Sequence, residues 1–314
     1  MVIAGCDSGF GRLIALNLNE EGFTVFAGCL SSSPTGLKEL SSSPTSLEEL
    51  SSGPVSLKEE CKFPDKMFPI PLDVTNEESI KSAFDTVKNL LSANHLKLWS
   101  LINNAGIAPF HEFEWGSFDL IRSVIEVNVL GMALVTRTFL PLIRISQGRI
   151  ININSVASRF AIPQTIGYDM SKHASLAFVE GLRREMFKFG VKVISVEPFL
   201  YKTNITNPDN IRKNGEKVWS ETDEEIRDVY GREYFDRMLQ FNEASVNSSF
   251  NRDPIEVASE VNHAVTSMYP KMTYAVSTLF WRFLFFLIPF MHPQELIEMA
   301  VNLGNVINGF HRTY

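Results

Sequence analysis

The sequence predicts an α/β protein with a Rossmann-type, doubly wound parallel sheet, and three observations support this. Short apolar runs alternate with longer amphipathic ones across residues 1–203, as in repeated βαβ units. A glycine-rich turn joins the first apolar run to the first amphipathic stretch. Polar residues follow several apolar runs, at the strand ends where such sheets bind ligands. We expect a single domain, with residues 204–314 forming a substrate loop and a helical C-terminal cap.

The expected elements follow in chain order. Strands are predicted at 1–5, 24–29, 67–74, 98–104, 148–155 and 191–198, and helices at 10–21, 76–93, 117–145 and 166–189. Asn76 is the expected N-cap of its helix, with Glu78 in the first turn. Beyond the core, 204–250 predicts one or two helices, 253–268 another helix begun by Asp253-Pro254, and MTYAV a further strand.

Residues 30–60 interrupt the alternation. LSSSPTGLKE, LSSSPTSLEE and LSSGPVSLKE repeat with a period of ten from Leu30 to Glu59. Ser-Ser-Pro favours a helix start, but each repeat is too short to be stable alone. We interpret the segment as a surface insertion; a partner-binding role is the less favoured alternative.

Composition excludes several classes of function. The net charge of −7 and the lack of a dense Lys/Arg run argue against nucleic acid as a partner. Three cysteines give no disulfide framework, and the six histidines show no zinc-ligand spacing, so no metal is expected. No secretory signal or membrane-spanning run is seen. Residues 279–290, LFWRFLFFLIPF, predict a buried helix or a peripheral membrane contact.

The glycine loop AGCDSGFG, residues 4–11, predicts a dinucleotide site. Glycines let the backbone approach a pyrophosphate, which would rest on the helix N-terminus. Cys29, Leu30 and Ser31 offer neither an acid nor a base to the adenosine ribose, and no cationic group for a 2′-phosphate is apparent near Ser8, which favours NAD over NADP. Asp73 could hold the adenine edge or cap a turn.

GYDMSK, residues 167–172, places Tyr168 and Lys172 on one helix face, since positions i and i+4 are neighbours there. Ser155 ends a strand, and so does NNAG at 103–106, on the same sheet edge. Asn128 lies within the apolar IEVNVLGMALV, where an amide is costly without buried partners. Each residue alone is compatible with a purely structural role; together they favour a functional one.

This combination of motifs resembles the short-chain dehydrogenase/reductase superfamily over residues 1–203. CDSGFG, FAGCL, FLPLIR and VEP are similar to the branch of D-3-hydroxybutyrate, retinol and hydroxysteroid dehydrogenases, and DVYGREYFDRM (228–238) to the hydroxybutyrate enzymes. The resemblance implies an oxidoreductase of lipid or steroid metabolism. It also implies a homo-oligomer paired through 117–145 and 166–189, and an intracellular, membrane-associated location, at the endoplasmic reticulum or mitochondrion.

The resemblance also implies residue roles. Tyr168 would be the general acid/base, Ser155 a donor to the substrate oxygen, and Asn128 the holder of a water linked to Lys172. The pKa of Tyr168 would have to fall from about 10 toward 7, by about 4 kcal/mol, through Lys172 and the nicotinamide. The residues expected to contact the dinucleotide are Gly5, Ser8, Gly9, Phe10, Gly11, Asp73, Asn104, Ala105, Gly106, Tyr168, Lys172, Pro198 and Thr203.

The chain departs from the family pattern at three positions. Ala4 stands where Thr is usual, Asn154 where Ser is common, and Phe199 where Gly follows proline, which makes the role of Thr203 less certain. The chain also begins inside its first strand, so we expect either a short N-terminus or a frayed strand. These departures keep open the alternative of a cofactor-binding scaffold with weak catalysis.

The expected substrate is a small-molecule alcohol or ketone. Apolar residues near the predicted pocket favour a lipophilic secondary alcohol such as a steroid or retinoid; they are Phe110, Phe113, Phe160, Ile162 and Phe199. A small hydroxy acid such as 3-hydroxybutyrate is the alternative. Its carboxylate would need a cation or an amide in the pocket, and His111, Lys202 and Arg212 are the candidates.

Overall fold

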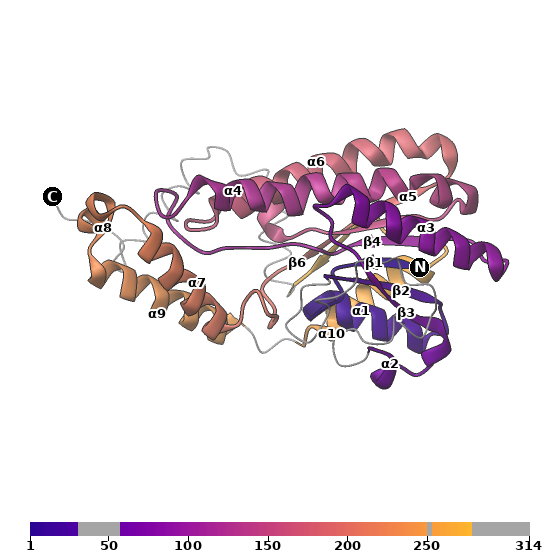
Figure 1. Ribbon diagram of the computed structural model, residues 1–314, viewed down its shortest axis with the longest axis horizontal. Helices are drawn as coiled ribbons and strands as arrows, with labels where there is room; N and C mark the ends of the chain where they lie inside the picture. Colours follow the sequence, from indigo (N-terminus) through magenta and orange to yellow (C-terminus); the bar gives the residue numbers. More distant parts are fainter. Residues whose placement is uncertain (31–56, 250–252, 278–314) are drawn as a thin grey trace.

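The computed structural model describes residues 1–30, 57–249 and 253–277, which form a parallel sheet with helices on both faces (Figure 1). The strand order is β3-β2-β1-β4-β5-β6-β7, and each neighbouring pair is parallel. The predicted Rossmann-type fold is therefore confirmed. The strands are β1 (Val2–Ala4), β2 (Val25–Cys29), β3 (Met67–Pro71), β4 (Ser100–Asn103), β5 (Arg149–Ile153), β6 (Lys192–Pro198) and β7 (Thr273–Val276).

Two layers of helices cover the sheet. One layer contains α3 (Glu77–Ala93), α4 (Phe118–Ile125), α5 (Met132–Ser146) and α6 (Ile166–Met186). The other contains α1 (Gly9–Glu20), α2 (Leu57–Glu60) and α10 (Ile255–Thr266). A separate group at the left of Figure 1 comprises α7 (Pro208–Glu221), α8 (Glu224–Tyr230) and α9 (Arg232–Ser249). Short 3-10 turns are η3 (Pro64–Lys66), η5 (Val156–Ser158) and η6 (Phe187–Phe189).

Alternate residues of each strand enter opposite cores. In β1, Val2 packs in the core formed with α3, α5 and α6, whereas Ile3 packs in the core formed with α1 and α10. Both side chains are fully buried. Strands covered on both faces are apolar at most positions, which is why the sequence shows nearly continuous apolar runs rather than alternation.

The first strand is held on both sides. β1 pairs with β2 and with β4, and the Met1 amine donates to Thr24 O at 2.6 Å. Fraying of this strand, one of the two alternatives expected for this end of the chain, is therefore not found. Because the sheet runs outward from β1 in both directions, the crevice between the carboxyl ends of β1 and β4 is the switch point where such sheets bind ligands.

Two helical predictions need correction. The helix expected over 117–145 contains a π-helical segment, η4 (Glu126–Gly131), between α4 and α5. A Cβ on Gly131 would lie 2.7 Å from Val74 O, so a close approach to the segment after β3 accompanies this π segment. The region 204–250 forms three helices rather than one or two, and Gly231, at a φ of +78°, separates α8 from α9. The Asn76 cap is confirmed, with its Oδ1 accepting from Ser79 N at 3.0 Å.

Helices α7–α9 enclose a small aromatic core of their own, which we call the helical lobe. Its centre is Trp115, from the loop between β4 and α4, which is 1% exposed and contacts Trp219 and Phe235 edge-on or tilted. The same loop is tied to the lobe by the bond from Gly116 N to Thr222 Oγ1 at 2.9 Å. Further side-chain bonds join Tyr234 to Glu112 and Tyr230 to Glu114. The lobe is therefore anchored to the β4–α4 loop by a buried ring and several hydrogen bonds.

Two predicted features lie outside the described residues. They are the repeats over 31–56 and the apolar segment 279–290. Within the described ranges, none of the helices combines the length and apolarity needed to cross a membrane. The same ranges contain no cluster of His, Cys, Asp or Glu suited to a metal ion.

We predict that Trp115→Ala lowers the free energy of unfolding by about 3–5 kcal/mol, because it empties the centre of the lobe core. Urea denaturation followed by circular dichroism measures this change. Phe187→Ala is the matched control, since that ring is 86% exposed and its loss should cost under about 0.5 kcal/mol. Equal losses in the two variants would contradict an organised core around Trp115.

Candidate functional site

A cleft of about 570 Å³ opens at the carboxyl ends of β1, β4 and β5. Its size suits a cofactor or small ligand. All residues predicted to contact a dinucleotide line it, except Gly11 and Pro198. The lining members of that set are Gly5, Ser8, Gly9, Phe10, Asp73, Asn104, Ala105, Gly106, Tyr168, Lys172 and Thr203.

The two exceptions lie beneath the cleft wall. A Cβ on Gly11 would meet Gly5 O at 2.0 Å, so this glycine is required by close packing of α1 against the loop. Pro198 ends β6, where it is buried and paired with Val276. Direct contact of either residue with a cofactor stays a prediction.

The glycine loop is shaped for an anion. Gly5 and Gly9 have φ values of +79° and +58°, which other residues rarely adopt, and a Cβ on Gly5 would lie 2.8 Å from Ala105 Cα. Asn104 Nδ2 donates to Gly5 O at 2.7 Å and fixes the loop against β4. The N-cap Ser8 makes no capping bond and the first turn of α1 carries no acid, so its N–H groups remain available to a pyrophosphate.

Asp7 is a cleft residue that the sequence interpretation missed. Both of its carboxylate oxygens accept from Leu30 N, at 3.0 and 3.1 Å. Leu30 directly follows β2, and both residues line the cleft. Burial raises the pKa of Asp7 above its usual value. The glycine loop thereby provides, at the end of β2, the acid that Cys29 and Leu30 lack.

Tyr168 and Lys172 face the same cleft from the first turns of α6. The Lys172 ammonium is 5.5 Å from the centre of the Tyr168 ring and donates to Ile153 O at 2.9 Å. Tyr168 is hydrogen-bonded to Ser155, which caps η5 by accepting from Ala157 N at 3.2 Å. The structure thus brings Ser155, Tyr168 and Lys172 together, with the end of β5 as their common support.

The pKa of Tyr168 does not fall toward neutrality as expected from the sequence. Burial raises the pKa of Tyr168 to about 12, which the hydrogen bond with Ser155 opposes and the Asp169 carboxylate reinforces. Burial lowers the pKa of Lys172 to about 8. The protein's own groups therefore do not bring the Tyr168 pKa toward neutrality, because desolvation of the phenol dominates and the ammonium donates to a backbone carbonyl.

Asn128 has the buried partners that its apolar surroundings require. Its Nδ2 donates to Ile107 O and to Ser171 Oγ, both at 2.9 Å, and its Oδ1 accepts from Ile107 N at 2.9 Å. The amide thereby clamps the loop after β4 to α6, next to Tyr168 and Lys172. Its predicted link to a water remains a prediction.

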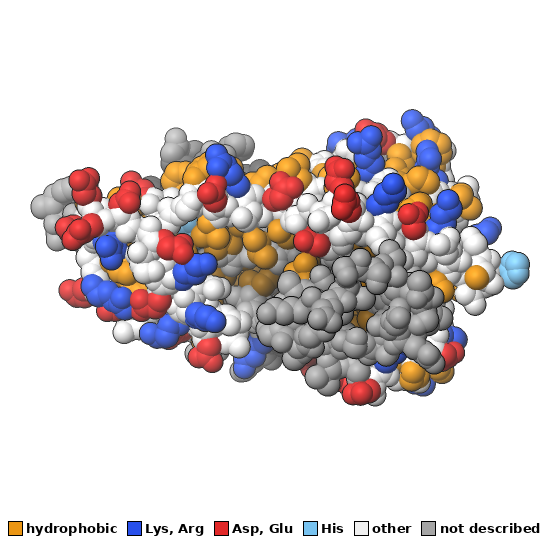
Figure 2. Space-filling view, viewed as in Figure 1, with side chains coloured by type: hydrophobic (Ala, Val, Ile, Leu, Met, Phe, Trp, Pro, Cys, Tyr) orange, Lys and Arg blue, Asp and Glu red, His pale blue; other side chains and the backbone are white. Residues whose placement is uncertain are grey.

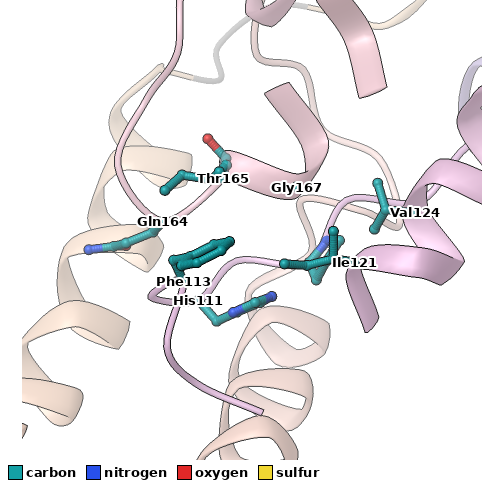
Figure 3. A pocket seen from close by; sticks show the side chains of 9 residues that line it. His111, Phe113, Ile121, Val124, Gln164, Thr165 and Gly167 are labelled. Carbon is teal, nitrogen blue, oxygen red and sulfur yellow. The ribbon is translucent and has the colours of Figure 1, made fainter. Parts of the chain in front are cut away.

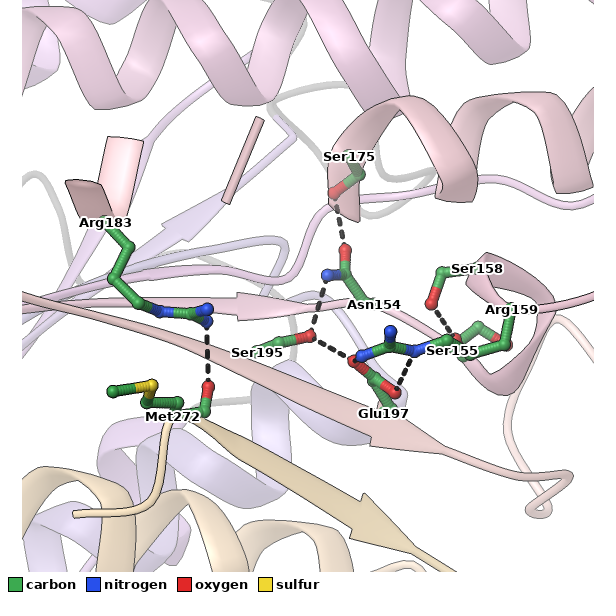
Figure 4. Close-up of polar contacts among 9 residues, drawn as sticks. All are labelled: Asn154, Ser155, Ser158, Arg159, Ser175, Arg183, Ser195, Glu197 and Met272. Carbon is green, nitrogen blue, oxygen red and sulfur yellow. Dashed lines mark hydrogen bonds and ion pairs between the residues drawn. The ribbon is translucent and has the colours of Figure 1, made fainter. Parts of the chain in front are cut away.

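A polar network that no sequence motif indicated supports the Ser155 turn (Figure 4). Arg159 pairs with Glu197 through two hydrogen bonds at 2.9 and 3.1 Å. Glu197 Oε1 accepts from Ser195 Oγ at 2.9 Å, and Asn154 Nδ2 donates to the same hydroxyl at 2.9 Å. Asn154 also accepts from Ser175 at 2.5 Å. The network joins β6, α6 and the turn after β5, and it gives Asn154, a departure from the family pattern, a structural role.

The expected substrate cations are not free to bind a carboxylate at the cleft. His111 is buried beside a cavity of about 10 Å³, which has room for about one water. Phe113, Ile121, Gln164 and other side chains also line this cavity (Figure 3). Its Nδ1 contacts Glu112 O at 2.7 Å. Arg212 pairs with Glu243 at 2.6 Å within the helical lobe. Lys202 is exposed and does not line the cleft.

A second hollow of about 540 Å³ adjoins the cleft. The two share Ile107, Asn204 and Ile205, and residues of α7 line one side of the second. Of the predicted pocket residues, Phe110 instead packs on the lobe core, and Phe113 and Ile162 are 53% and 37% exposed. The hollow between the loop after β4 and α7 is therefore the better candidate for the substrate side.

We predict that Lys172→Met raises the free energy of unfolding at pH 7 by roughly 1–3 kcal/mol, because it removes a buried charge but also the bond to Ile153. The lowered pKa of about 8 means that wild-type stability from this group is full above about 10.5 and is lost as pH falls through 8. The gain in the variant should therefore shrink between pH 8 and 10.5. Urea titrations across this range measure it; a gain independent of pH would contradict the buried charge.

Comparisons with known proteins agree with this geometry. The family model of short chain dehydrogenases matches residues 1–214. Over 285 residues the chain is 37% identical to the mitochondrial D-beta-hydroxybutyrate dehydrogenase of Mus musculus, covering 90% of this chain and 77% of that protein. It is 36% identical to retinol dehydrogenase 7 of Rattus norvegicus over 306 residues, 97% of this chain and 88% of that one.

Solved structures show the same fold. A short-chain dehydrogenase from Streptomyces avermitilis superposes with a TM-score of 0.62 at 24% identity, covering 99% of this chain and 97% of that chain. One from Burkholderia cenocepacia, solved in complex with NADP, also gives 0.62 at 20% identity, with 96% and 95% coverage. The sheet order agrees with these matches. The chain belongs to the short-chain dehydrogenase/reductase family, whose members are oxidoreductases acting on alcohols and ketones.

Proposed function

We propose that this protein is an NAD(H)-dependent oxidoreductase that interconverts a lipophilic secondary alcohol, such as a steroid or retinoid, and its ketone. The observation that carries the proposal is the position of Tyr168 and Lys172 on the wall of a cleft whose other end is an open helix N-terminus. An anion site and an acid/base pair in one cleft suit a phosphate-bearing cofactor and a proton-coupled reaction.

In this mechanism each residue has a defined task. The residues lining the cleft would hold NAD, which would supply a hydride acceptor and the positive charge of its nicotinamide ring. Tyr168 takes the proton of the alcohol or returns it to the ketone, and Ser155 donates a hydrogen bond to the same substrate oxygen. Lys172 stays protonated below its pKa of about 8, stabilises the phenolate and holds the ribose. Asn128 fixes the loop that carries Ile107 over the cleft and is proposed to retain the water next to Lys172.

Asp7 supports NAD as the cofactor. Its carboxylate lies at the end of β2, where an acid favours a ribose 2′-hydroxyl and repels a 2′-phosphate. Among the described residues lining the cleft, Lys172 is the one lysine or arginine. Arg12, on α1, pairs with Glu60 at 2.7 Å and does not line the cleft.

The hollow beside the cleft supports a lipophilic substrate. Ile107, Pro109, Leu120 and Ile205 contribute apolar side chains to it. The alternative, a small hydroxy acid, is kept because a D-beta-hydroxybutyrate dehydrogenase is among the relatives. In that case Lys217 is the cation that lines the hollow, although Glu221 lies 3.9 Å from it. A scaffold that binds cofactor without turnover is the third candidate.

The remaining parts of the proposal concern partners and location. We propose a homo-oligomer paired through α4, η4, α5 and α6, because Phe118 on α4, Leu130 on η4 and Met170 on α6 are each more than half exposed. We also propose an intracellular, membrane-associated location; the mitochondrial D-beta-hydroxybutyrate dehydrogenase among the relatives supports its intracellular part. A peripheral membrane contact through 279–290 belongs to the same proposal.

We predict that the wild-type protein oxidises a steroid or retinol with NAD faster than it oxidises 3-hydroxybutyrate, as measured by NADH absorbance over a substrate panel. Tyr168→Phe should lower kcat/KM by about 10²–10⁴ because it removes the proton-transfer group. NADH binding, followed by fluorescence, should change little in the variant. Wild-type binding without turnover on the whole panel would favour the scaffold.

We predict that wild-type protein binds NADH at least about tenfold more tightly than NADPH, and that Asp7→Asn reduces this ratio by about tenfold, since a close charge repulsion of this kind is worth about 1.4 kcal/mol. Fluorescence titration with both dinucleotides measures the ratio without turnover. Asp73→Asn is the matched control: Asp73 lines the cleft but bonds Thr75, and its loss should affect both dinucleotides alike. An unchanged ratio in Asp7→Asn would remove Asp7 from cofactor choice.

A further inference from the structure

The edge of the sheet opposite the cleft exposes a group of large apolar side chains. They lie in the four segments that precede or enter β4, β5, β6 and β7, namely residues 94–99, 144–149, 187–192 and 267–272. The most exposed are Phe187 (86%), Tyr269 (83%) and Met268 (74%), followed by Met272, Ile145, Leu96, Phe189 and Trp99. Single exposed apolar residues are ordinary, but a continuous group marks an interaction surface. We call these four segments the amino edge.

Side-chain contacts join the four segments into one surface. Trp99 Nε1 donates to Val265 O at 3.0 Å, and Arg149 lies over the Trp99 ring at 5.1 Å. Lys192 Nζ donates to Met268 O at 2.9 Å. Arg144 lies 5.2 Å from the centre of the Phe189 ring, which links the second segment to the third. The exposed rings and methionines are therefore neighbours on a stable frame and not separate loop tips.

The charge of the amino edge is opposite to that of the whole protein. Its four segments contain no aspartate or glutamate, whereas the chain has a net charge of −7. The exposed cations are Lys97, Arg144, Lys188, Lys192 and Lys271. At the right-hand end of Figure 2, where β1 begins in Figure 1, blue and orange side chains gather side by side. Basic and aromatic side chains mixed in this way suit the headgroup layer of a membrane.

A second copy of the chain fits the amino edge less well than an anionic membrane does. A twofold interface brings the same patch from both subunits together, so the lysines would face lysines. An anionic lipid surface instead complements the cations, and it accepts Phe187, Tyr269 and the methionines at the headgroup boundary. Without such a local basic surface, a protein of charge −7 would be repelled by anionic lipid.

The geometry points to the amino edge as a docking surface for anionic membranes. The docking orientation follows from the sheet, because the cleft lies at the carboxyl ends of the strands and the amino edge at the other ends. A docked molecule keeps its cleft open to water, so dinucleotide binding is unaffected by docking. The inference uses described residues alone, which do not include the segment 279–290, and it does not rest on the proposed enzymatic function.

The test is co-sedimentation of the full chain with vesicles, either of pure phosphatidylcholine or of equimolar phosphatidylcholine and phosphatidylserine. We expect binding to the mixed vesicles that weakens with added salt, and little binding to the neutral ones. Lys188→Glu with Lys271→Glu should weaken partitioning at least about tenfold, given the usual contribution of each lysine near an anionic surface. Phe187→Ser with Tyr269→Ser should also weaken it, at unchanged net charge.

Lys81→Glu with Lys213→Glu is the matched control, since it makes the same change of net charge at exposed positions on α3 and α7. It should leave partitioning within about twofold of wild type, and NADH fluorescence titration confirms that every variant keeps its cleft. Equal loss in the control, equal binding to both vesicles, or unchanged binding of the amino-edge variants would each overturn the inference. So would light scattering that shows the amino-edge variants dissociating an oligomer while vesicle binding persists.

Discussion

A buried cation is the constraint around which the site is built. Lys172 is 7% exposed, and its ammonium donates to the carbonyl of Ile153, so the end of β5 has to stand in the right place for the charge to be tolerated. A charge held in this way costs stability, which the two cores on either side of the sheet must offset. The same placement brings Lys172 next to Tyr168, since the two residues are one helical turn apart on α6.

The surroundings of this pair show why the phenol needs a partner from outside the chain. Burial moves the pKa of Tyr168 upward and that of Lys172 downward, because it disfavours the charged form of each group; at pH 7 Lys172 is still mainly protonated. The hydrogen bond from Ser155 is the protein's own opposing influence on the phenol. Ser155 is in turn placed by a turn that Arg159 and Glu197 brace against β6. A cationic cofactor ring beside the phenol would shift the balance toward phenolate only when bound, which couples proton transfer to cofactor binding.

The parts of the site that the sequence could predict are those encoded within short segments. The spacing of Tyr168 and Lys172, the glycine turn and the Asn76 cap each depend on a few consecutive residues, and the structure bears them out. Asp7 was missed because its carboxylate reaches the end of β2 through a hydrogen bond from Leu30 N. Only the pairing of β1 with β2 brings these two residues together. The π segment around Asn128 and the three helices after 204 depend on packing, which periodicity does not report. The prediction for His111 failed for the same reason. Its polarity suggested a group that binds a substrate carboxylate, but the surrounding side chains bury it beside a small cavity away from the cleft.

The proposed docking surface and the cleft lie at opposite ends of the sheet, and this arrangement affects which substrates can reach the cleft. A molecule docked through its amino edge turns the cleft toward water, so a lipophilic alcohol would have to leave the bilayer before reaching Tyr168. A small hydroxy acid meets no such barrier, and Lys217 offers it a cation within the hollow. Membrane docking and substrate class are therefore linked by geometry. If the protein docks as inferred and still prefers a steroid or retinoid, its substrate must arrive in solution or on a carrier.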